Sequence, residues 1–251
     1  MASATSKTLV LITGANQGIG FETARHLVNN GKFHVLLGAR SMAKAKEATR
    51  KLESVDVTPV VLDVADDTSV ATAVKFVTER FGRLDILINN AGITKSSNPN
   101  TSTRENYRAV FDVNIFGVAV VTDAFLPLLR ASKYPDRRIV NVTTGLAQFG
   151  VAHSSESPFG VKKTPGLHVY RASKAALHML TAESAVTLAS EGITVTLASP
   201  GYCRTNFTHN QGFKDADAGA MVIVRAAIEG DSQKLLGTIV CDECSVEEFG
   251  W

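Results

Sequence analysis

The sequence has little of several features that would assign it to a special structural class. Only three of its 251 residues are cysteines, Cys203, Cys241 and Cys244, which are too few for the disulfide framework of a small secreted protein. Cys241 and Cys244 form a C-x-x-C without the second ligand pair that a structural zinc site requires, so we expect no metal. Charged residues make up 20% of the chain, and 26 Lys and Arg stand against 24 Asp and Glu without a block of like charge. A disordered chain and a nucleic-acid-binding face are therefore not expected.

Long hydrophobic runs are also missing. A membrane-spanning helix needs about 20 predominantly apolar residues, and the richest region, 110–129, is interrupted by Asp112, Asn114 and Asp123. Residues 1–7 are small and polar and have no apolar core of the kind found in signal peptides, so we interpret them as a flexible tail. The sequence therefore predicts no membrane span and a cytoplasmic location.

Two hydrophobic patterns alternate along the rest of the chain. Between apolar runs, residues such as Val70 and Val74 recur at helical spacing, and Gly31, Gly82 and Gly192 each stand where a helix would end before a strand. The apolar runs, typical of strands buried on both faces, are Thr8–Thr13, Phe33–Gly38, Val57–Leu62, Leu84–Ile88, Arg138–Val142 and Ile193–Ala198. This alternation predicts an α/β fold with a doubly wound parallel sheet, Rossmann-like, whose ligand lies at the carboxyl ends of the strands.

We expect a single domain over residues 8–251, because no linker or internal repeat divides the chain. Residues 145–168 are rich in glycine and proline and lie between a strand and a helix of the same sheet, so they form an inserted loop. Aromatic and histidine side chains of this loop, with those after the sixth strand, are candidates to line the substrate site. They are Phe149, His153, Phe159, His168, Phe207, His209 and Phe213, and the terminal Phe249 and Trp251 could add to this wall.

A glycine-rich turn follows the first strand directly and runs into the first helix. Thr13–Gly20 reads T-G-A-N-Q-G-I-G. Gly14 suits a turn with positive φ, Gly18 lets the backbone approach a pyrophosphate, and Gly20 allows helix and strand to pack closely. This context predicts a dinucleotide site, with Gly14, Asn16, Gln17, Gly18, Ile19 and Gly20 as its candidates.

The end of the second strand indicates which dinucleotide is bound. An acidic residue at this point usually binds the ribose hydroxyls of NAD, whereas arginine accommodates the 2′-phosphate of NADP. This chain has Arg40 there, and Lys44 lies one helical turn further on. Two cations facing a phosphate dianion favour NADP(H) as the cofactor.

Tyr170 and Lys174 are four residues apart at the start of a long helical run, so both project from one helix face. A phenol is protonated at neutral pH, and a nearby ammonium group lowers its pKa, which would make Tyr170 a better proton donor to a developing alkoxide. A Y-x-x-x-K pattern alone is common in helices and usually means a buried ring and a solvated lysine. Its significance depends on the motifs that accompany it.

Those motifs are Asn89-Asn90-Ala91-Gly92, Asn114, Asn141-Val142-Thr143-Thr144-Gly145 and Pro200-Gly201-Tyr202-Cys203-Arg204-Thr205. Together with the glycine-rich turn and the Tyr170–Lys174 pair, they resemble the short-chain dehydrogenase/reductase family, particularly its carbonyl-reductase-like members, over about residues 8–240. The resemblance implies Tyr170 as the catalytic acid, Lys174 as the ribose-binding group and Asn114 as the holder of a water beside Lys174. It also implies cofactor contacts at Asp63, Val64, Asn90, Ala91, Gly92, Pro200, Gly201 and Thr205, of which Asp63 would bind the adenine.

The chain departs from the family pattern in two ways. Thr144 stands where the family has its catalytic serine, and its hydroxyl can still donate to a substrate oxygen. The stretch from Thr144 to Tyr170 is also longer than the family norm, because it holds the inserted loop. His153 or His168 as an acid or base is an alternative, although a surface loop histidine is the simpler interpretation.

We therefore predict an NADPH-dependent reduction of a ketone or aldehyde, reversible, with a small carbonyl or alcohol compound as partner. Physiological oxidation of an alcohol would use the same residues. A dinucleotide-binding regulator with little turnover is the alternative from another class. We expect a monomer or a homodimer.

Overall fold

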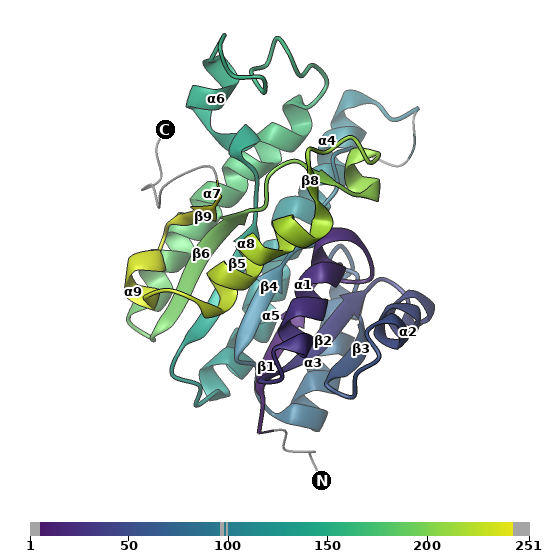
Figure 1. Ribbon diagram of the computed structural model, residues 1–251, viewed down its shortest axis with the longest axis vertical. Coiled ribbons are helices and arrows are strands. Elements are labelled where there is room, and N and C mark those ends of the chain that lie inside the picture. The colour runs from purple at the N-terminus through teal and green to yellow at the C-terminus, as the bar shows by residue number, and fades with distance from the viewer. Residues whose placement is uncertain (1–5, 96–97, 99, 243–251) are drawn as a thin grey trace.

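The computed structural model of the protein describes residues 6–95, 98 and 100–242. Its centre is a sheet of seven parallel strands in the order β3-β2-β1-β4-β5-β6-β9 (Figure 1). The strands are β1 (Thr8–Ile12), β2 (Phe33–Ala39), β3 (Val57–Val61), β4 (Ile86–Asn89), β5 (Arg137–Val142), β6 (Ile193–Ser199) and β9 (Ile239–Cys241), and β7 (Cys203–Arg204) pairs with β8 (Lys214–Asp215). The strand order reverses between β1 and β4, which places the ligand crevice of such a sheet at the carboxyl ends of these two strands.

Helices cover both faces of the sheet (Figure 1). They are α1 (Gly18–Asn29), α2 (Met42–Lys51), α3 (Asp67–Phe81), α4 (Thr103–Phe111), α5 (Gly117–Ala131), α6 (Phe149–His153), α7 (His168–Ala189), α8 (Ala216–Ile228) and α9 (Ser232–Leu235), with a π-helix η1 (Asp112–Phe116) and 3₁₀ turns η2 (Gly145–Ala147) and η3 (Asn206–Thr208). Val10 and Ile12 of β1 face a core that includes α1, α2 and α8, whereas Leu9 and Leu11 face one that includes α3, α5 and α7. This alternation explains why the strand sequences are apolar on both faces.

The predicted doubly wound parallel sheet in a single domain is confirmed, and all six predicted strands form within two residues of the expected bounds. Gly31, Gly82 and Gly192 have φ angles of 79°, 69° and 67°, as expected for left-handed helix ends. The seventh strand, β9, was not predicted, because three residues at a sheet edge give too short a pattern. Lys7 belongs to the fold rather than to a tail, since its Nζ lies 2.6 Å from Oδ2 of Asp56.

α4, η1 and α5 form one continuous helix of 29 residues, Thr103–Ala131, which contains an 18-residue window with a mean hydropathy of 1.8. By length and composition alone this helix could cross a membrane, so the expectation that no segment is long and apolar enough is wrong. The polar residues at 112, 114 and 123 do not interrupt the helix. α5 packs against α3 and the sheet as one of the layers of the fold, which makes helix length a weak indication of membrane insertion.

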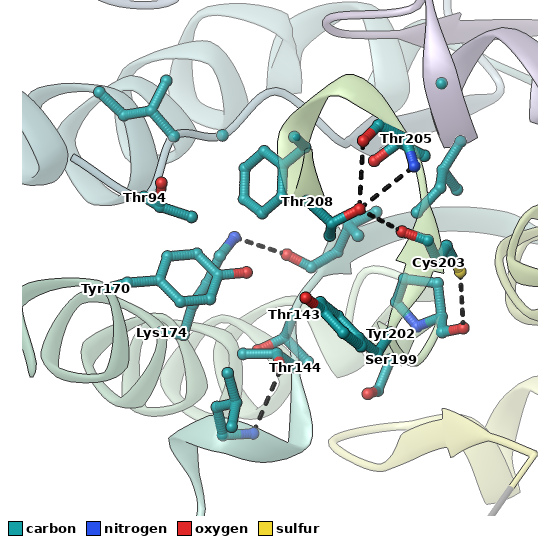
Figure 2. Close-up of a pocket in the computed structure, with 18 of the residues that line it drawn as sticks. Thr94, Thr143, Thr144, Tyr170, Lys174, Ser199, Tyr202, Cys203, Thr205 and Thr208 are labelled. Atoms are coloured by element: carbon teal, nitrogen blue, oxygen red, sulfur yellow. Dashed lines mark hydrogen bonds between the residues drawn. The ribbon is translucent and has the colours of Figure 1, made fainter. Parts of the chain in front are cut away.

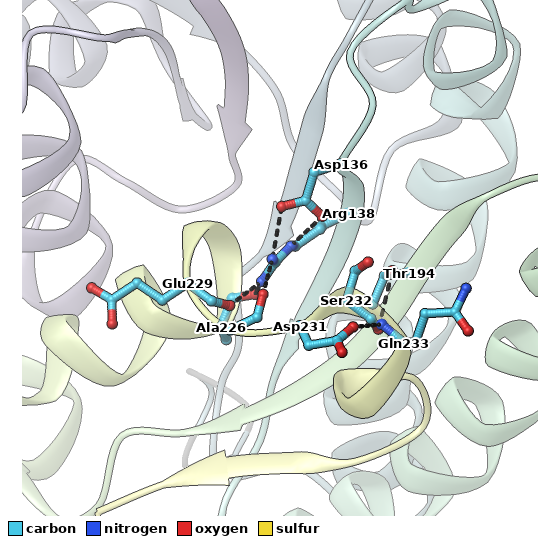
Figure 3. Close-up of polar contacts among 9 residues, drawn as sticks. Asp136, Arg138, Thr194, Ala226, Glu229, Asp231, Ser232 and Gln233 are labelled. Carbon is cyan, nitrogen blue, oxygen red and sulfur yellow. Dashed lines mark hydrogen bonds and ion pairs between the residues drawn. The ribbon is translucent and has the colours of Figure 1, made fainter.

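A buried arginine fixes the position of α8 on the sheet (Figure 3). The Arg138 side chain on β5 is 1% exposed and donates to the carbonyl oxygens of Ala226, Glu229 and Gly230 at 3.0, 2.6 and 3.0 Å. The last carbonyl groups of a helix have no partner within the helix, and a cation is favourable at that end. Asp136 pairs with the same guanidinium at 2.7 Å, so the buried charge is balanced.

The inserted loop at residues 145–168 contains η2 and α6, followed by turns that lead to α7. It lies beside the carboxyl ends of β5 and β6 (Figure 1). Cys203 is a free, buried cysteine. Cys244, Phe249 and Trp251 lie outside the described residues.

Candidate active site

A cavity of about 1000 Å³ opens at the carboxyl ends of the strands, where the topology places a ligand. Figure 2 shows Tyr170, Lys174 and Thr144 around one space, with Tyr202 on its other side. These four residues, of which Thr144 and Tyr202 are 58 positions apart in the sequence, thus share one site. Of the predicted residues, the cavity is lined by Gly14, Asn16, Gln17, Gly18, Ile19, Gly20, Arg40, Asp63, Val64, Asn90, Ala91, Gly92, Thr144, Tyr170, Lys174, Pro200, Gly201 and Thr205.

The glycine-rich turn has the geometry that its sequence predicts. Gly14 and Gly18 have φ angles of 64° and 59°, which residues with a side chain rarely adopt. A Cβ on Gly20 would lie 2.4 Å from Nδ2 of Asn90, so this glycine permits close approach of α1 to the loop after β4. α1 begins at Gly18, and its N-cap residue Gln17 makes no capping hydrogen bond with its side chain. The first N–H groups of α1 therefore suit an anion such as a pyrophosphate.

The two predicted phosphate-binding cations are placed differently. Arg40 follows β2 and lines the cavity with an exposed side chain. Lys44 is exposed in the first turn of α2 and does not line the cavity. Asp63 lines it from the end of β3, where its Oδ1 accepts a hydrogen bond from the Ala65 N–H at 3.2 Å. The structure thus brings Arg40 and Asp63 to the cavity and leaves Lys44 out of its lining.

Tyr170 and Lys174 lie one turn apart on α7, and both are buried, with exposures of 8% and 4%. The Lys174 ammonium lies 6.0 Å from the Tyr170 ring centroid and donates to the Val142 carbonyl oxygen at 2.8 Å. Burial raises the pKa of Tyr170 and lowers the pKa of Lys174 to about 8. The net pKa shift of Tyr170 is therefore upward, opposite to the lowering expected from the sequence, because loss of solvent outweighs a cation at that distance.

The two threonines after β5 both line the cavity but have different hydrogen-bond partners. Thr143 is buried, and its Oγ1 lies 2.8 Å from Nε2 of His178 on α7. Thr144 is half-buried at the start of η2, where its Oγ1 accepts a hydrogen bond from the Leu146 N–H at 3.2 Å. That bond uses the hydroxyl oxygen as an acceptor and leaves its proton available. Thr144 is thus the better placed of the two to donate to a ligand.

Asn114 is fully buried behind the cavity rather than in its lining. It lies in the π-helix η1, a form that interrupts α-helices frequently at functional sites. Its amide hydrogen-bonds both the N–H and the carbonyl oxygen of Ile93 at 2.9 Å, and donates to Oγ of Ser173 at 2.9 Å. Asn114 therefore links the loop after β4 to α7, the helix of Tyr170.

A chain of buried side chains fixes the strand ends that carry these residues. Asn89 donates to Oδ1 of Asn141 at 2.9 Å and to Oγ1 of Thr122 at 3.2 Å. Asn141 donates in turn to Oγ1 of Thr181 at 2.9 Å. The chain runs across β4, β5, α5 and α7, and buried polar groups that are fully hydrogen-bonded hold their elements in one arrangement.

Only some of the aromatic and histidine candidates line the cavity. Phe159, Phe207, His209 and Phe213 line the cavity, whereas Phe149, His153 and His168 do not. The His168 ring instead lies near Tyr107, with centroids 6.2 Å apart. Neither loop histidine is therefore placed to act as the acid or base in this cavity.

Two residues near the site were missed in the sequence. His178 follows Lys174 by one further helical turn, and burial together with the Lys174 charge lowers its pKa to about 4. The spacing of Tyr170, Lys174 and His178 on one helix face was the signal that could have found it. Arg171 is buried beside Tyr170 and contacts the inserted loop, and no sequence pattern indicates those contacts.

Comparison with known proteins supports a single family. A family model described as short chain dehydrogenase matches residues 8–215. The short-chain dehydrogenase anuI of Penicillium roqueforti is 56% identical over 252 residues, which cover 99% of this chain and 100% of that protein. The short-chain dehydrogenase/reductase eupG of a Phoma species is 37% identical and is matched over 82% of this chain and 80% of its own length.

Solved structures share the fold. Salutaridine reductase from Papaver somniferum is 26% identical, with a TM-score of 0.78 over 93% of this chain and 99% of that one. NADPH-bound carbonyl reductase from chicken fatty liver is 24% identical and has a TM-score of 0.82 over 98% and 100% of the two chains, a likeness of fold alone. With the family model over most of the chain and a close relative over all of it, this protein belongs to the short-chain dehydrogenase/reductase family of oxidoreductases.

Proposed function

We propose that the protein reduces a ketone or aldehyde to an alcohol with NADPH, and that the reaction is reversible. The observation that carries this proposal is that Tyr170, Lys174 and Thr144 line the same cavity as the glycine-rich turn and Arg40. NADPH, when bound, supplies the hydride that the carbonyl carbon takes up. The residues of this chain have to bind the cofactor, hold the carbonyl group and supply the proton.

Tyr170 is the proposed proton donor. Because burial raises its pKa, its phenol stays protonated at neutral pH and the proton is there when the carbonyl oxygen gains negative charge. The Lys174 pKa of about 8 leaves its ammonium mostly charged at pH 7, where it would bind ribose hydroxyls and favour the phenolate that Tyr170 becomes. In the direction of alcohol oxidation, the same phenolate takes the proton back.

Thr144 is the proposed second donor to the carbonyl oxygen. Its hydroxyl proton is not used in the contact with Leu146, and a donor aimed at developing charge stabilises the transition state more than the ground state. Thr143, which contacts His178, supports the end of β5 instead.

Arg40 supports NADPH rather than NADH. Its exposed guanidinium stands at the end of β2, where an adenosine ribose would lie, and it can form a charge-assisted pair with a 2′-phosphate. Lys44 adds a second positive charge in the neighbouring first turn of α2.

Replacement of Tyr170 tests this function. We expect Tyr170→Phe to retain NADPH binding, measured by nicotinamide fluorescence, and to lose most NADPH consumption with a panel of ketones and aldehydes. Tyr107→Phe is the matched control, because it removes a phenol that lies outside the cavity. Its turnover should stay within about twofold of the unmodified protein.

Retained carbonyl reduction in Tyr170→Phe would show that another group supplies the proton. NADPH binding by the unmodified protein without turnover of any carbonyl or alcohol would favour the alternative, a dinucleotide-binding regulator. The intact pairing of Tyr170 with Lys174 is an argument against the regulator. Thr144 at the position of the family's serine is the observation that favours it.

A further inference from the structure

Three aromatic rings that line the cavity lie against one another and form a continuous wall. The Phe159 ring centroid lies 6.3 Å from that of Tyr202 and 6.4 Å from that of Phe213, and the Tyr202 and Phe213 centroids are 5.4 Å apart. All three residues line the cavity. We call them the aromatic wall. Phe159 comes from the inserted loop, whereas Tyr202 and Phe213 follow β6, so the wall exists only while the loop is held in place.

Arg171 holds the loop. It follows Tyr170 on α7 and is 7% exposed. Its guanidinium donates to the Leu146 carbonyl oxygen at 3.0 Å, to Oγ1 of Thr164 at 2.6 Å and to the Phe159 carbonyl oxygen. One side chain thus fixes the beginning of the loop and the segment that carries Phe159. A rigid guanidinium with several donors suits this contact better than a lysine does.

The exposure of aromatic side chains in and beside the aromatic wall indicates an apolar ligand. The Phe213 side chain is 74% exposed although its ring contacts two others, and Phe207, whose ring lies 5.8 Å from that of Tyr170, is 42% exposed. Large exposed aromatic side chains around a cavity gain free energy when a ligand covers them. Aromatic rings also prefer tilted or edge-to-face contacts with another ring over contacts with an aliphatic group of equal area.

We propose that Arg171 is a positioning residue for substrate selection, which holds Phe159 in the aromatic wall and so makes the cavity prefer carbonyl compounds that bear an aromatic ring. The proposal rests on the proposed carbonyl reduction for its substrate class. Arg171 itself acts through the loop, because it does not line the cavity.

Binding of a matched pair of ketones tests this inference separately from turnover. Acetophenone and cyclohexyl methyl ketone share a carbon skeleton and differ in the aromatic ring. The full-length protein, saturated with NADP⁺ so that no reduction occurs, is titrated with each ketone in a calorimeter. We expect acetophenone to bind about 3- to 10-fold more tightly, the scale of one or two aromatic contacts. Equal affinities would overturn the proposal.

Variants then test the role of Arg171. Phe159→Leu keeps an apolar side chain without a ring, and we expect it to reduce the preference for acetophenone at least about twofold. Arg171→Lys should reduce the preference to the same extent, and the double variant should reduce it no further, because Arg171 acts through Phe159. In steady-state assays with NADPH, the loss of preference should appear as a higher KM for acetophenone, with kcat changed equally for the two ketones.

Additive effects of the two substitutions, or a full preference in Arg171→Lys, would refute the positioning role. If Arg171→Lys does not fold, Thr164→Val removes one acceptor of the guanidinium from a half-buried loop position and should lower the preference in the same direction. A binding preference in a protein that reduces neither ketone would contradict the proposed reductase activity and leave the selection by the aromatic wall standing.

Discussion

Replacement of Arg138 by methionine should destabilise the protein strongly without touching the cavity. The guanidinium is 1% exposed and satisfies three carbonyl oxygens at the end of α8, besides pairing with Asp136, whose side chain is 31% exposed. Methionine fills much of the volume but donates no hydrogen bond. Unsatisfied buried acceptors cost about 1–3 kcal/mol each, and loss of one partner of a buried ion pair costs about 3–5 kcal/mol. Because water can reach Asp136 and part of the α8 end, we expect a loss of about 3–5 kcal/mol in the free energy of unfolding.

Urea unfolding followed by circular dichroism measures this loss, with Arg130→Met as the matched control. Arg130 forms a similar two-bond pair with Glu191 at 2.6 and 2.7 Å, but its side chain is 50% exposed, so its replacement should cost less than about 1 kcal/mol. A loss below about 1 kcal/mol in Arg138→Met would refute the assignment of Arg138 as the group that fixes α8. Asp136→Asn keeps one of the two acceptor oxygens of the guanidinium and removes the charge, so its loss in the free energy of unfolding should lie between those of the two arginine variants.

Three further predictions concern the site. Arg40→Asp should narrow or reverse a preference for NADPH over NADH, because it replaces attraction to the 2′-phosphate by repulsion, and equal dissociation constants for the two cofactors in the unmodified protein would contradict this. Thr144→Ala should lower kcat by about 10²-fold, the usual scale for one lost donor, whereas Thr144→Ser should stay active. Thr143→Ala should lower thermal stability more than turnover. If Thr143→Ala lost turnover and Thr144→Ala kept it, the assignment of Thr144 as the donor would be wrong. Burial, and the Lys174 charge beside it, lower the pKa of His178 from 6.5 to about 4, so the unfolded chain takes up a proton between these pH values that the folded chain does not. The free energy of unfolding should therefore fall as pH drops from 6.5 to 4, and His178→Gln should reduce that slope by up to about 1.4 kcal/mol per pH unit, while unchanged slopes would exclude His178 as a source of acid sensitivity.

The sequence predicts the cofactor side of the site well, because its signals are local. Gly14 and Gly18 are required by backbone angles within one turn, and the strand before them and the helix after them are visible as hydrophobic patterns. Tyr170 and Lys174 share a helix face through their spacing alone. Thr144 follows from the family resemblance, because it stands after the fifth strand at the position of the family's serine. In each case neighbouring residues carry the information.

The contacts that hold the loop and α8 could not be predicted in this way. Arg138 and Arg171 donate mainly to backbone carbonyl oxygens, and every residue type offers such an acceptor, so the partner leaves no trace in the sequence. Arg138 stands at the start of an apolar run, directly after Arg137, and nothing in this pattern distinguishes the buried arginine from its neighbour. The direction of the Tyr170 pKa shift also depends on burial that only the assembled fold defines.

The amide of Asn114 imitates a peptide group. It accepts from the N–H and donates to the carbonyl oxygen of the same residue, Ile93, as a residue on an antiparallel strand does with its partner. The Asn114 side chain therefore pairs with Ile93, in the loop after β4, as a residue of a neighbouring strand would. Its remaining amide hydrogen is donated to Oγ of Ser173 on α7. Aspartate at this position would lack the donors and leucine would lack both functions. A single carboxamide thus fixes the loop proposed to contact the cofactor relative to the helix that carries the proposed proton donor.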